Sequence, residues 1–93
     1  MDLNDKLMIK CNQSPVAWAQ FKQELDDARD HLVTLLGEMD SDSAYGEENL
    51  RIDLGHVYAH LNRAWNSRNS MAALSGEEWE RFREFPNDIH PIA

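Results

Sequence analysis

Hydrophobic residues recur at alternating spacings of three and four along the first half of the chain, which is the repeat of one face of an α-helix. Ser14 precedes the run and can cap a helix, and Pro15 suits the first helical turn, where no N–H partner is needed. The spacing therefore predicts a helix over 15–39, with a stripe formed by Trp18, Phe21, Leu25, Ala28, Leu32, Leu35 and Met39.

A second stripe follows after a short polar stretch at 40–43, which has the composition of a turn. It predicts a helix over 44–69 that carries Leu50, Leu54, Val57, Leu61 and Ala64 on one face. Because the connection is short, we expect the second helix to turn back and pack antiparallel to the first.

Ser75 and Glu78 form a capping-box pattern that predicts a short third helix over 76–85, which Pro86 ends. The residues after it, 86–93, predict an irregular tail. Residues 1–13 are ambiguous between a helical and an extended pattern. At this length we expect one domain over 1–93.

The fold class predicted is all-α: a long antiparallel helical hairpin with a short C-terminal helix. A short third helix does not cover the apolar surface of two long ones, and a chain of this size buries a thin core. We therefore expect a homodimer in which two hairpins form a four-helix bundle.

Acidic residues outnumber basic ones by 17 to 9, a formal net charge of −8. That balance argues against direct nucleic-acid binding and against docking on anionic membranes, both of which need basic surfaces. No apolar run approaches a membrane span and no signal-peptide layout is present. The chain has a single cysteine, Cys11, which cannot form an intramolecular disulfide. Because an oxidising compartment would not stabilise this fold, we expect a cytoplasmic protein.

Histidines and acids share a flank of each long helix. Positions i, i+3 and i+7 lie on one side of a helix, and an antiparallel pairing brings the two flanks together. Imidazole and carboxylate ligands suit a divalent transition metal. One alternative is that each histidine forms a solvent-exposed hydrogen bond with an acid of its own helix, such as Asp53 with His56. Another is a pH-sensitive contact with a partner. The candidate metal ligands are His31, Asp53, His56, His60, Asp27 and Glu24.

Between Asp53 and Glu77 the chain carries no acid, although the chain as a whole is acidic. Arginine and tryptophan are enriched at binding hot spots, so this segment is a candidate for binding a partner or an anionic ligand. The alternative is that its arginines pair with the acids that return at Glu77, Glu78 and Glu80. The candidate residues are Arg63, Trp65, Asn66 and Arg68.

No catalytic motif is present, so the leading hypothesis is a small helical interaction or regulatory protein without its own catalysis and without a cofactor. Its acidic surface would suit a basic protein partner. The alternative hypothesis is a metal-binding helical-bundle protein, with hydrolysis as one role, that uses the histidine and aspartate cluster.

Overall fold

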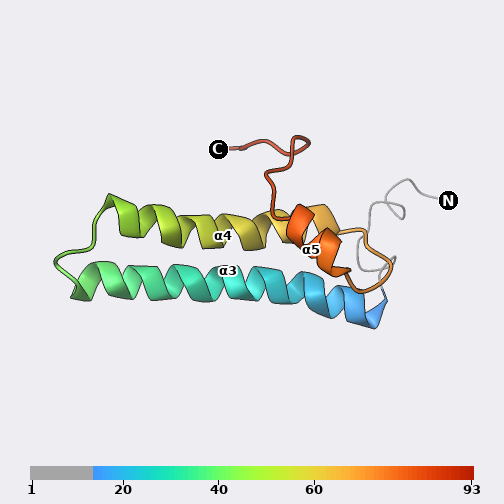
Figure 1. Cartoon of the computed structure of the whole chain (residues 1–93), viewed down its shortest axis with the longest axis horizontal. Helices are drawn as coiled ribbons and strands as arrows, with labels where there is room; N and C mark the ends of the chain where they lie inside the picture. The colour runs from blue at the N-terminus through green and yellow to red at the C-terminus, as the bar shows by residue number, and fades with distance from the viewer. Residues whose placement is uncertain (1–13) are drawn as a thin grey trace.

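The computed structural model describes residues 14–93, so the ambiguous segment 1–13 lies outside the described residues. Two long helices, α3 (Pro15–Ser41) and α4 (Glu47–Ser67), pack side by side as an antiparallel hairpin (Figure 1). A short helix, α5 (Gly76–Arg81), lies against the end of α4 away from the connecting loop. The described part of the chain contains no strand, so it is all-α, and the predicted hairpin is confirmed.

The ends of the helices differ from the predicted bounds for local reasons. Helix α3 continues to Ser41, whose hydroxyl donates to the Gly37 carbonyl. Helix α4 begins at Glu47 rather than at 44, because a turn at 42–45 comes first. In that turn the Asp42 carboxylate accepts from the Ala44 amide, and the Asp42 carbonyl accepts from the Tyr45 amide. At its other end α4 stops at Ser67, two residues before the predicted end at 69.

The third helix is also shorter than the predicted 76–85. The Ser75 hydroxyl accepts from the Glu78 amide, and the Glu78 side chain accepts from the Ser75 amide, which confirms the capping box. The carbonyls of residues 82–84, however, accept from asparagine side chains of α4. After Phe82 the backbone makes a tighter turn, in which the Glu84 amide donates to the Arg81 carbonyl, and the asparagine contacts hold residues 82–84 against α4. Pro86 has no N–H with which a helix could continue.

The core between the long helices is thin. Its buried hydrophobic residues are small or medium-sized, and no large side chain among residues 14–93 is completely buried. Ala28, Leu35 and Val57 form its centre, with Leu50 and Leu54 packed against them. Within the described residues, no helix is long and apolar enough to cross a membrane.

Candidate functional site

Three imidazole rings meet where the two long helices pack. His31 of α3 lies between two histidines of α4, with its ring centroid 5.3 Å from that of His56 and 5.0 Å from that of His60. His56 and His60 are four residues apart and therefore share a face of α4. The structure thus brings together the three histidines that the sequence placed on matching flanks.

The three candidate carboxylates have different surroundings. Glu24 lies next to His60, with its Oε2 2.8 Å from the His60 Nδ1. Asp27 instead accepts from the Gln23 side chain at 2.8 Å, and Asp53 accepts from the Tyr45 hydroxyl at 2.7 Å. Within residues 14–93 no hydrogen bond joins Asp53 to His56 or Asp27 to His31, the pairs expected if each histidine paired with an acid of its own helix.

The contact between Tyr45 and Asp53 is reflected in the ionisation of the phenol. Desolvation, together with the hydrogen bond to the Asp53 carboxylate and its negative charge, raises the pKa of Tyr45 to about 12. The Asp53 carboxylate thus ties the loop residue Tyr45 to α4. Of the three candidate carboxylates, Glu24 is the one that contacts a histidine.

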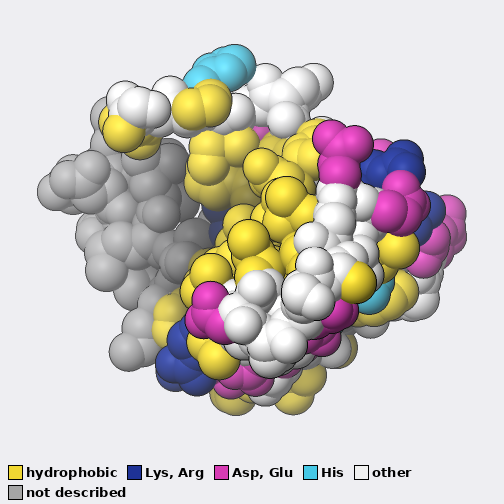
Figure 2. Space-filling view, turned by 90° about the vertical axis from the view of Figure 1, so that its left-hand side faces the viewer, with side chains coloured by type: hydrophobic (Ala, Val, Ile, Leu, Met, Phe, Trp, Pro, Cys, Tyr) yellow, Lys and Arg dark blue, Asp and Glu magenta, His cyan; other side chains and the backbone are white. Residues whose placement is uncertain are grey.

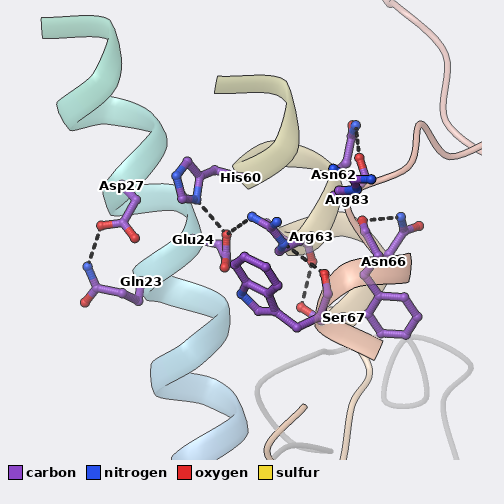
Figure 3. A network of polar contacts seen from close by, with 12 residues as sticks. Gln23, Glu24, Asp27, His60, Asn62, Arg63, Asn66, Ser67 and Arg83 are labelled. Carbon is purple, nitrogen blue, oxygen red and sulfur yellow. Dashed lines mark hydrogen bonds and ion pairs between the residues drawn. The ribbon is translucent and has the colours of Figure 1, made fainter. Parts of the chain in front are cut away.

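Glu24 also connects the histidines to a buried arginine. The Glu24 Oε2 lies 4.0 Å from a terminal nitrogen of Arg63, on the side away from His60 (Figure 3). The Arg63 side chain is 6% exposed, and Glu24 is its counter-charge in a place where an unpaired charge is costly. The arginine and the carboxylate therefore stabilise each other between the helices.

As the side chains stand, no group of three or more histidine, cysteine, aspartate or glutamate residues in 14–93 is arranged so that it could hold a metal ion. The histidine rings contact one another through their faces and edges. A metal site at this place therefore requires the rings to turn.

The acid-free segment of α4 contacts the C-terminal part of the chain. Arg63 donates through Nε to the Trp79 carbonyl at 3.0 Å, and its guanidinium lies 3.6 Å from the centre of the Trp79 ring. Asn66 donates to the carbonyls of Phe82 and Glu84. These contacts hold α5 against the end of α4.

Trp65 and Arg68 hold the tail in a similar way. The Trp65 indole N–H donates to Asp88 at 2.8 Å, and the Arg68 guanidinium stacks 3.7 Å from the Trp65 ring centre and lies 3.5 Å from the Asp88 carboxylate. The hydrogen bond from Trp65, together with the positive charge of Arg68, holds the pKa of Asp88 below its ordinary value.

The four candidate binding residues of the segment therefore all contact other parts of the chain, and binding of an external partner through them stays a prediction. The sequence offered the acids of 76–80 as partners for both arginines. The structure instead places Arg63 against the Trp79 carbonyl, the Trp79 ring and Glu24, and Arg68 near Asp88. Sequence reasoning missed Asn62, which donates to the Arg83 carbonyl, and Asp88. Backbone acceptors leave no signal in a sequence, so only the run of asparagines hinted at these contacts.

The side of the hairpin opposite the histidines is apolar and partly exposed, and at its α4 edge the ring of Tyr58 packs against that of Phe85 in the tail. Leu25, Leu32 and Leu36 are 40–58% exposed on α3, and Tyr58 and Leu61 are 48% and 41% exposed on α4. Their spacing places them on the flank of each helix that turns away from His31 and His60. We call these five residues the apolar face. Figure 2, which looks along the hairpin from its loop, shows hydrophobic side chains gathered in a band on one side of the molecule.

Comparisons of the chain with protein-family models, with curated proteins and with solved structures gave no significant match.

Proposed function

We propose that this chain is a small helical interaction or regulatory protein, without catalysis of its own, whose apolar face packs on a second copy to form a four-helix bundle. The observation that supports this proposal is the apolar face itself. Leu25 and Leu32 belong to the stripe of α3 and Leu61 to that of α4, yet each is 40% or more exposed in the single hairpin. Burying apolar surface of this kind is the main favourable term in most associations.

A second copy is the occupant whose size and pattern match this face. Helix α4 has 21 residues, so the shared length of the hairpin is about 30 Å at 1.5 Å per residue. Two helices side by side are about 20 Å wide, so the face covers about 600 Å² per copy, near the roughly 800 Å² per partner of a standard interface. The heptad spacing of Trp18, Leu25, Leu32 and Met39 is the pattern that packs helices into bundles.

Such a dimer leaves the acidic groups of both copies outside the apolar face. With a formal charge of −8 per chain, the outer surface would attract a basic protein partner and speed its encounter. We include a basic partner and a cytoplasmic location in the proposal. An oligolysine peptide is the simplest probe for the first of these: salt-sensitive binding is expected, and failure to bind at low salt would count against it.

Light scattering coupled to gel filtration tests the dimer. The expected mass is twice the 10.8 kDa of the chain at micromolar concentration. Leu32→Glu places a charge in the middle of the apolar face and should give a monomer, because the charge would be buried without a partner.

Val33→Glu is the matched control. Val33 is the next residue of α3, is 65% exposed and points away from the apolar face, so this variant should remain a dimer. Circular dichroism verifies that both variants stay helical. A monomeric parent protein at high concentration would contradict the proposal, as would equal dissociation of the two variants.

A further inference from the structure

We propose that His31, His56 and His60 bind one divalent transition-metal ion between α3 and α4, with Glu24 orienting His60. This site lies on the side of the hairpin away from the apolar face, so it does not depend on dimerisation. It also differs from the six-residue set that the sequence suggested. Asp27 and Asp53 are left out of it because their carboxylates accept from Gln23 and Tyr45, whereas Glu24 is the carboxylate that contacts a histidine among residues 14–93.

The separation of the rings suits a shared ion. With metal–nitrogen distances of about 2.0–2.1 Å and tetrahedral angles, the centres of two ligating imidazoles lie about 5 Å apart. The centroid of His31 is 5.0 Å and 5.3 Å from those of its two neighbours. His56 and His60, one helical turn apart, reach to the same side of α4. The helix packing therefore brings His31 within this spacing of both histidines of α4, and the rings must turn for all three to reach one ion.

The contact with Glu24 prepares His60 as a ligand. A carboxylate only accepts hydrogen bonds, so the His60 Nδ1, 2.8 Å from Glu24, carries the proton. The Nε2 atom then has the free lone pair that a metal needs. Histidine ligands of metals commonly donate their other ring N–H to a carboxylate in this way. Glu24 is itself held by Arg63 on its far side, as Figure 3 shows, so it acts as a positioning residue.

The other two histidines have room to turn. His56 is exposed, and a hollow of about 130 Å³ lined by Asp27, Asp30, His31 and Thr34 lies beside the ring of His31. Rotation of these two rings would replace their ring-to-ring contacts by bonds to one ion, with water in the remaining position. Three imidazoles favour Zn²⁺, Ni²⁺ or Cu²⁺ over Mg²⁺ or Ca²⁺, which prefer oxygen ligands.

Calorimetric titration of the untagged full chain with ZnSO₄ and NiCl₂ tests the site. We expect one ion per chain, no binding of Mg²⁺, and weaker binding as the pH falls, because protons compete with the metal for imidazole nitrogen. An ion at about 100 times its Kd multiplies the ratio of folded to unfolded protein by about 100, so the melting temperature should rise.

Single substitutions identify the ligands. His31→Gln and His56→Gln should each weaken binding at least tenfold, and Glu24→Gln should weaken it by roughly 10–100-fold through its effect on His60. His90→Gln is the matched control, because His90 is exposed in the C-terminal tail and its loss should change nothing. Circular dichroism without metal separates loss of a ligand from loss of the fold, and His56 is exposed enough for its replacement to be tolerated.

Three results would overturn the proposal. One is no binding of either ion at millimolar concentration. Another is equal loss in the His56 and His90 variants, which indicates general binding to surface imidazoles. The third is full retention of affinity by the His31 variant, because an ion held by α4 alone does not bridge the two helices.

Discussion

Replacing Arg63 by methionine tests whether a single buried arginine holds the third helix in place. Arg63 is buried at the end of α4, where it donates to the Trp79 carbonyl, stacks on the Trp79 ring and lies near Glu24. Methionine keeps the length and much of the apolar stem but removes the guanidinium. The substitution therefore removes the polar contacts to α5 and the counter-charge of Glu24, while leaving little empty space.

The expected cost follows from these contacts. A hydrogen bond from a charged group contributes about 1.5–3 kcal/mol, and a partly desolvated cation–π contact contributes about 0.5–2 kcal/mol. The contacts share one side chain and are not additive, so we expect a loss of about 2–4 kcal/mol in the free energy of unfolding. At roughly 4–8 °C per kcal/mol for a domain of this size, the melting temperature should fall by about 10–30 °C.

Thermal melts and urea titrations followed by circular dichroism measure this loss. Arg51→Met is the matched control, since Arg51 is exposed and its ion pair with Glu48 should contribute at most about 1 kcal/mol. If Arg63 instead serves an external partner, Arg63→Met should leave stability nearly unchanged. A loss below about 1 kcal/mol, or one no larger than that of the control, would refute the structural role.

Two other expectations follow from the tail and from α4. The pKa of Asp88 is lowered from 3.8. The ionised Asp88 carboxylate therefore holds the tail on α4 fully above about pH 4, and this stabilisation is lost as the pH falls through the lowered pKa. The Trp65 indole proton in an NMR titration should report this loss, and Asp88→Asn should abolish the pH dependence; an unchanged titration in that variant would contradict it. Gly55→Ala should stabilise the protein by about 0.5–1 kcal/mol, because a Cβ at Gly55 meets nothing within 4 Å in the helix interior. A fall in melting temperature would show that a neighbour needs the space.

The two long helices could be predicted from the sequence because their signals are local. The repeat of Leu25, Leu32 and Leu35 fits only a helical period, and the Ser14–Pro15 and Ser75–Glu78 pairs mark helix starts through contacts over three residues. The short connection then required an antiparallel hairpin. The ends of the helices were less well predicted, because the turn at 42–45 and the asparagine contacts to residues 82–84 compete with the helical pattern.

The histidine cluster, too, was predicted in part from the sequence and in part only shown by the structure. Heptad positions alone placed His31 opposite His56 and His60, since an antiparallel pair matches flank to flank. Which carboxylate serves them was settled only in three dimensions: Tyr45 and Gln23 engage Asp53 and Asp27, which leaves Glu24 next to His60.

Contacts of the C-terminal region were likewise beyond the sequence. The partners of Arg63, Asn66 and Trp65 lie 16–23 residues away, and two of these three side chains bind backbone carbonyls, which every residue carries. The sequence by itself determined the helices, their pairing and the flank that each side chain occupies, because these depend on periodicity and on loop length. The tertiary structure decided which buried polar groups meet, because desolvated donors select among many acceptors by position in space.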